Sequence, residues 1–118
     1  MRLKASFLPA ISNKAKKHIW QEIKGWRLLW MTNKELTEIA EKYNPVIGGW
    51  LNYYGKYGRA ELSKVLDSVN RHLCHWIRRK YKRYKHKPYQ ARCLLKKISL
   101  GNRDLFAHWK VGILPSAG

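Results

Sequence analysis

The sequence predicts an all-α protein of about five helices, packed as a small bundle with one long basic helix. Apolar residues recur at helical spacing along most of the chain, and no segment shows the alternation of a β-strand. Six tryptophans and a hydrophobic share of 45% can form a core, so a disordered chain is not expected despite a net charge of +18. A length of 118 residues suits one domain.

The N-terminal part is expected to lead from an extended segment into the first helix. Residues 1–11 are predicted to be extended, and Ser12 is predicted to cap a helix over residues 12–26. The folded domain is expected to span residues 12–112, and residues 113–118 are expected to form a frayed tail.

Two further helices are predicted on either side of a proline. Thr32 and Glu35 match a capping box and indicate a helix that ends at Asn44, because Pro45 disfavours helical geometry in the residue before it. Asn44 and Pro45 also suit the start of a third helix, which runs to about Tyr54.

The helix after Pro45 contains an unusual pair of glycines, Gly48 and Gly49. Each glycine weakens a helix by about 1 kcal/mol, so the pair indicates close approach of another backbone or of a ligand. Trp50 and Tyr54 share one face of this helix and are predicted to fill the core.

The longest helix is predicted over residues 59–84, followed after Pro88 by a shorter one over residues 89–98. The long helix should bury an unbroken apolar stripe: Leu62, Leu66, Val69, Leu73, Ile77, Tyr81 and Tyr84.

The end of this long helix holds the strongest functional signal. Residues 76–87 carry seven cations and no acid, and after Asp67 the only acidic residue is Asp104. Such a density of positive charge suits the phosphates of nucleic acid, although charge alone leaves RNA and DNA both open. The cations predicted to bind RNA are Arg78, Arg79, Lys80, Lys82, Arg83, Lys85 and Lys87.

No cofactor, metal site or catalytic centre is expected. His72, Cys74, His75 and Cys93 lack the paired spacing of a zinc site, and Cys74 is expected to pack as a small hydrophobe. The acids are scattered, which does not suit Mg²⁺ binding. Two cysteines without a disulfide framework suit the cytoplasm, and no apolar run approaches the roughly 18 residues of a membrane span.

Residues 44–55 resemble the signature of the group II intron maturase-specific domain. They read NPVIGGWLNYYG, and the family pattern is Asn-Pro, a few residues, Gly-Trp and then an aromatic pair. Residues 7–12 (FLPAIS), 76–81 (WIRRKY) and 105–109 (LFAHW) are similar to family segments as well. The resemblance covers roughly residues 7–112.

The resemblance implies a thumb, or X, domain that binds group II intron RNA and assists its splicing, with no enzyme activity of its own. The chain lacks the Tyr-x-Asp-Asp polymerase motif, so it is expected to be the C-terminal piece of an RNA-directed DNA polymerase/maturase. A separately encoded fingers and palm domain is a possible partner. The rival interpretations are a thumb that grips template–primer duplex and a general DNA-binding helical module.

Residues of the signature region divide into two predicted groups. Asn52 and Tyr53 point away from the core face and are predicted to contact RNA, because unpaired bases stack on aromatic rings. The residues given an architectural role are Asn44, Pro45, Gly49, Trp50 and Tyr54.

Overall fold

The computed structural model describes residues 11–56 and 58–116, and within them all regular structure is helical. The prediction of an all-α bundle is confirmed. Of the segment 1–11, expected to be extended, all but Ile11 lies outside the described residues. The elements are α1 (Asn13–Gly25), the 3-10 helix η2 (Leu28–Trp30), α2 (Leu36–Tyr54), α3 (Arg59–Lys80), the 3-10 helix η3 (Lys82–Tyr84), α4 (Pro88–Gly101) and α5 (Ala107–Lys110).

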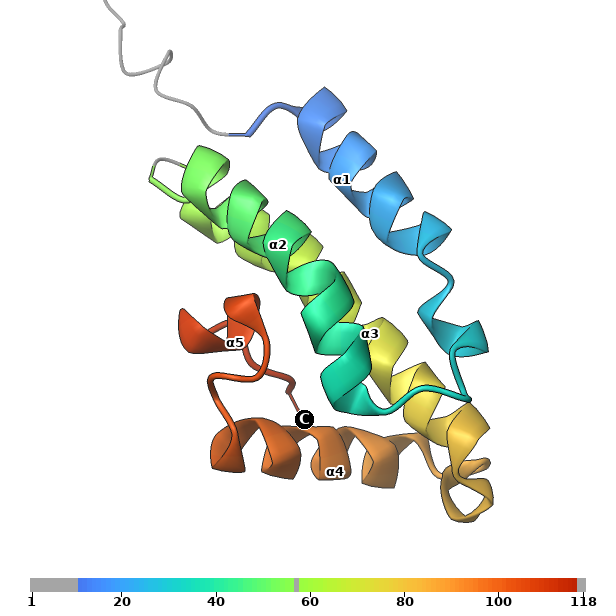
Figure 1. Cartoon of the computed structure of the whole chain (residues 1–118). Coiled ribbons are helices and arrows are strands. Elements are labelled where there is room, and N and C mark those ends of the chain that lie inside the picture. Colours follow the sequence, from blue (N-terminus) through green and yellow to red (C-terminus); the bar gives the residue numbers. More distant parts are fainter. Residues whose placement is uncertain (1–10, 57, 117–118) are drawn as a thin grey trace, which may run out of the picture.

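Helix α3 is the spine of the bundle, since α1, α2, α4 and both 3-10 helices contact it. In Figure 1, α2 runs antiparallel along the front of α3, α1 flanks this pair, and α4 crosses near the C-terminal end of α3. The predicted apolar stripe is confirmed as far as Ile77, and its buried members are Leu62, Leu66, Val69, Leu73 and Ile77.

The start of α1 agrees with the sequence, and the start of α2 does not. The Ser12 hydroxyl accepts a hydrogen bond from the Ala15 amide at 3.1 Å, as expected of an N-cap. The predicted capping box of Thr32 and Glu35 is wrong. Glu35 is itself the N-cap, and its amide donates to the Glu38 carboxylate at 2.8 Å. The same chemistry is thus used three residues later than predicted.

The two helices predicted on either side of Pro45 are one continuous helix, α2. Tyr43 and Ile47, before and after the proline, are both buried in the core, so packing favours one unbroken helix despite the missing proline N–H. Asn44 lies inside α2 and is not the N-cap of a third helix. Its side chain donates to the Leu105 carbonyl and accepts from the Ala107 amide, both at 2.9 Å, and so attaches the start of α5 to α2.

Two expectations for the second half of α2 are wrong, the approach of another backbone to the glycine pair and the core position of Trp50 and Tyr54, while approach of a ligand to the glycines stays a prediction. A Cβ at Gly48 or Gly49 would meet nothing within 4 Å, so no other part of the described chain approaches either glycine. Trp50 and Tyr54 are half-buried at the margin of the core rather than inside it. Trp50 stacks on Trp26 with ring centroids 5.7 Å apart.

The predicted helix over residues 59–84 is also interrupted. Helix α3 ends at Lys80, Tyr81 is extended with φ −114° and ψ 112°, and η3 follows. Tyr81 is 40% exposed, whereas Tyr84 is half-buried and packs against the core. A continued helix would carry Tyr84 onward along the α3 axis, while the turn brings it back toward α4.

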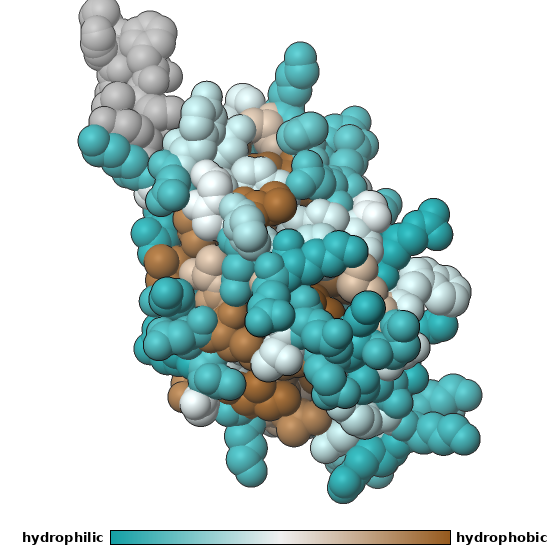
Figure 2. All heavy atoms as spheres, viewed as in Figure 1, coloured by the Kyte–Doolittle hydropathy of each residue, from teal (hydrophilic) through white to brown (hydrophobic). Residues whose placement is uncertain are grey.

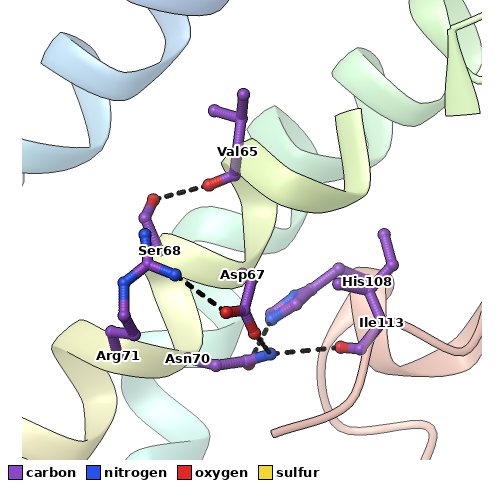
Figure 3. A network of polar contacts seen from close by, with 7 residues as sticks. All are labelled: Val65, Asp67, Ser68, Asn70, Arg71, His108 and Ile113. Atoms are coloured by element: carbon purple, nitrogen blue, oxygen red, sulfur yellow. Dashed lines mark hydrogen bonds and ion pairs between the residues drawn. The ribbon is translucent and has the colours of Figure 1, made fainter. Parts of the chain in front are cut away.

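The segment after α5 is held in place by a polar network around Asn70 of α3 (Figure 3). The Asn70 side-chain oxygen accepts from His108 Nε2 and Trp109 Nε1, both at 2.8 Å, and the Asn70 amide donates to the Ile113 carbonyl at 3.3 Å. Ile113 and Pro115 are buried, so the expectation of fraying is wrong for the described residues 113–116. Burial lowers the pKa of His108 to about 3 and keeps its imidazole neutral.

Candidate nucleic-acid interface

The last turns of α3 and the chain that follows them form a basic groove of about 490 Å³. Hydrophilic side chains cover this end of the bundle in Figure 2, at the lower right of the view. Among the described residues, no acid lines the groove, and the lysines and arginines that line it favour an anionic ligand. The lining residues are Leu29, His75, Arg78, Arg79, Lys82 and Lys85.

Arg78 shapes this groove by closing the turn after α3. Its Nε and Nη2 atoms donate to the Lys85 carbonyl at 3.3 and 3.1 Å. The bonds hold Lys85 beside the last turn of α3, although the two positions are seven apart in the sequence. Arg78 therefore contributes charge to the groove and also positions a second cation in it.

Arg79 lies against Trp30, the last residue of η2. The guanidinium carbon of Arg79 is 4.3 Å from the centroid of the Trp30 ring, a distance typical of a cation–π contact. Trp30 remains 65% exposed. An open aromatic surface thus adjoins the cations of the groove.

The Lys80 side chain, predicted to bind RNA, makes its polar contacts within the protein and does not line the groove. Its ammonium donates to the carbonyls of Thr32 and Lys34 at 3.1 and 2.6 Å, and it lies 3.5 Å from the Glu35 carboxylate. Only 14% of the Lys80 side chain is exposed. Lys80 therefore ties α3 to the segment that precedes α2.

The remaining cations of the run lie outside the groove. Arg83 packs over the Tyr84 ring at 5.4 Å and lines a different, more apolar hollow between α3 and α4. Lys87 is exposed just before α4. The structure therefore brings four of the seven predicted cations together in the groove: Arg78, Arg79, Lys82 and Lys85.

Asn52 and Tyr53 are accessible but distant from this groove. Both are exposed on the last turn of α2, with Tyr53 at 80%. The C-terminal ends of the antiparallel helices α2 and α3 lie at opposite ends of the bundle in Figure 1. One compact site cannot include both groups.

The histidines and Cys74 on α3 have perturbed acid–base properties. Burial, and then the charge of Arg78, lowers the pKa of His75, so a neutral imidazole lines the groove at pH 7. Burial, and then the charges of His75, Arg71 and Lys24, lowers the pKa of His72. Burial raises the pKa of Cys74 to about 11, and the residue packs on the core as expected.

Two further features bear on ligands and membranes. In the part of the chain that the structure describes, no three His, Cys, Asp or Glu side chains lie close enough together to hold a metal ion. Over the same residues, every helix is too short or too polar to cross a bilayer.

Comparison with protein families identifies the chain. The model of the group II intron maturase-specific domain matches residues 15–96, from α1 into α4. The chain belongs to this family. Comparisons with curated proteins and with solved structures gave no significant match. The matched family is a maturase-specific domain and not the catalytic domain of a polymerase.

Within this maturase-specific domain, sequence reasoning missed three residues of the groove region: Leu29, Trp30 and His75. Leu29 and Trp30 belong to a short apolar run between two predicted helices, and the prediction assigned this run to neither. An unplaced tryptophan outside every apolar stripe was the available signal. Its proximity to Arg79 depends on the packing of η2 against α3.

Proposed function

We propose that this maturase-specific domain binds group II intron RNA and assists its splicing. The observation that carries the proposal is the acid-free basic groove at the end of α3, in a chain that belongs to the maturase-specific family. Arg78, Arg79, Lys82 and Lys85 bind phosphates there, and the exposed Arg83 and Lys87 extend the contact.

The mechanism is electrostatic and positional. Folding of a large RNA brings phosphates together, and cations on a rigid helix offset their repulsion while counterions are released. The groove is positioned by the buried stripe of α3 and by the bonds from Arg78 to the Lys85 carbonyl. The chemistry of splicing belongs to the RNA itself.

The exposed end of α2 forms a second, weaker candidate surface. Asn52 and Tyr53 can contact another part of the RNA, because a large intron can span both ends of the bundle. A separately encoded fingers and palm domain is a further proposed partner. The two free cysteines, Cys74 and Cys93, suit the reducing cytoplasm, where we place the protein.

Salt-dependent RNA binding tests the proposal. The purified chain is titrated with a self-splicing group II intron transcript over a salt series, and a slope that indicates about five or more phosphate contacts is expected. The double variant Lys82→Ala/Lys85→Ala should reduce this slope by about two. Lys14→Ala/Lys17→Ala, with the same loss of charge on exposed positions of α1, is the matched control.

The same titrations distinguish the rival functions. Equal affinity for duplex DNA and for the intron transcript at matched salt would replace the proposal with a general DNA-binding module. Preference for an RNA–DNA duplex over the intron would favour a polymerase thumb. An intron splicing assay at limiting Mg²⁺ supplies the functional readout, and no stimulation by the bound protein would refute the role in splicing.

A further inference from the structure

The least explained feature of the surface is Trp30, a large aromatic residue that is 65% exposed and yet held on a rigid support. Leu28, two residues before it, is 1% exposed and anchors η2 in the core. The Met31 carbonyl, one residue after it, accepts a hydrogen bond from Trp76 Nε1 of α3 at 2.7 Å. The Trp30 backbone is therefore fixed on both sides.

The turn that leads into Trp30 has an uncommon conformation. Arg27 has a φ of 54° and a ψ of 49°, in the left-handed region that residues other than glycine rarely adopt. Its carbonyl accepts the Trp30 amide at 2.9 Å. Backbone in such a region persists where the surroundings enforce it, and these residues cluster at ligand sites. Here the enforced turn presents Trp30 outward.

One face of the Trp30 indole is already covered by a groove residue. Arg79 lies over the ring at 4.3 Å and also lines the groove with Arg78, Lys82 and Lys85. Because most of the Trp30 surface remains accessible, the opposite face of the ring is open. An aromatic surface polarised by a cation thus stands beside a row of phosphate-binding groups.

From this arrangement we propose that the groove receives one unpaired nucleotide of RNA. Its phosphate lies among the cations of the groove and its base stacks on the open face of Trp30. A volume of about 490 Å³ falls within the range of small-ligand sites. This inference rests on the proposed RNA binding and adds which structural state of the RNA the groove selects.

The geometry of RNA determines whether the bound nucleotide is paired or unpaired. In an RNA duplex, each base face is covered by its neighbours, and the narrow major groove admits no side chains. A bulged or terminal base has a free face, and every base can stack on an aromatic ring whatever its sequence. Trp30 can therefore contribute to binding only where a base is unpaired.

Two RNA hairpins test the inference, identical except for one bulged nucleotide. Wild-type protein should bind the bulged hairpin about tenfold more tightly at matched salt, within the range expected for loss of one base stack. A third hairpin with an abasic bulge distinguishes the contribution of the bulged base from that of the bulged backbone. It should bind with the same affinity as the fully paired hairpin.

Trp30→Ala should abolish the preference while leaving affinity for the paired hairpin and the salt slope unchanged. Trp20→Ala is the matched control, because Trp20 is also exposed, at 41%, with a cation over its ring, Lys24 at 4.4 Å, but this cation, unlike Arg79, does not line the groove. Trp30→Phe should retain much of the preference, because an aromatic face remains. Melting curves of the variants should coincide with wild type, since Trp30 is mostly exposed.

The possible results separate this inference from the function on which it rests. Equal binding of paired and bulged hairpins, or a preference that survives Trp30→Ala, overturns the unpaired-nucleotide site and leaves RNA binding intact. Failure to bind any of the hairpins or the intron transcript overturns both. A preference retained by the abasic bulge shows that backbone flexibility is recognised, and it refutes stacking on Trp30.

Discussion

Lys80 and Lys82 are two residues apart in the basic run, and the structure predicts opposite consequences for their loss. Replacing either by Met removes one positive charge and keeps an unbranched apolar stem. Lys80 donates to two backbone carbonyls and is 14% exposed on its side chain, whereas Lys82 is exposed and lines the groove. Equal changes in net charge therefore isolate the effect of location.

The expected size of the Lys80→Met effect follows from its contacts. A hydrogen bond to a charged group contributes about 1.5–3 kcal/mol, and the bond to the partly buried Thr32 carbonyl should approach that value. The exposed Lys34 carbonyl can be solvated instead, and the ion pair with the exposed Glu35 adds little. We expect the free energy of unfolding to fall by about 2–4 kcal/mol. Lys82→Met should stay within about 0.5 kcal/mol of wild type.

Urea denaturation followed by circular dichroism measures the first effect, and RNA titrations over a salt series measure the second. Lys82→Met should reduce the salt slope by about one, while Lys80→Met should leave it nearly unchanged. If Lys80→Met proved as stable as wild type and reduced the slope like Lys82→Met, the assignment of a structural role to Lys80 would be wrong.

Three further predictions concern stability. Asn70→Ala leaves the buried donors of His108 and Trp109 without an acceptor, at about 1–3 kcal/mol each, so urea denaturation should show a loss of about 2–6 kcal/mol. The exposed Asn52→Ala, its control, should change stability by less than about 0.5 kcal/mol, and similar results for both would contradict the network. Because burial lowers the pKa of His108 to about 3, the unfolded chain takes up the proton first as pH falls below about 6.5. Stability should be complete above that pH and decline toward pH 3, by about 1 kcal/mol between pH 7 and 5.5 from this residue. His108→Gln keeps a donor and cannot titrate, so it should flatten the profile, and an unchanged profile would exclude His108 as its cause. Gly49→Ala should raise the melting temperature through a gain of up to about 1 kcal/mol in helix propensity, since the added Cβ meets nothing within 4 Å. A lower melting temperature would show that the site is not open.

Charge patterning located the candidate interface but could not divide its cations by role. The run over residues 76–87 predicts one continuous basic surface, because the sequence gives the order of the charged residues but not the direction in which each side chain points. Where a side chain points depends on where the helix ends. By ending at Lys80, α3 directs Lys82 and Lys85 into the groove with Arg78 and Arg79, while Arg83 faces a different hollow.

A helix boundary predicted from neighbouring residues was also wrong where burial in the core outweighed their local preference. The Asn44–Pro45 pair indicates a helix boundary, because proline disfavours helix in the residue before it. Burial of Tyr43 and Ile47 on one face outweighs that preference, and the Asn44 side chain is left free to attach the segment before α5.

The sequence by itself determined the helical class, the buried stripe of α3 from Leu62 to Ile77, the cap at Ser12 and the family resemblance. These features depend on periodicity and on neighbours within one turn, which are local properties of the chain. Only the tertiary structure decided that Trp30 stands against Arg79, that Lys80 faces inward and that Asn70 holds the segment after α5. Each of these contacts joins residues about 40 or more positions apart, and such pairs are set by how helices pack rather than by any pattern within them.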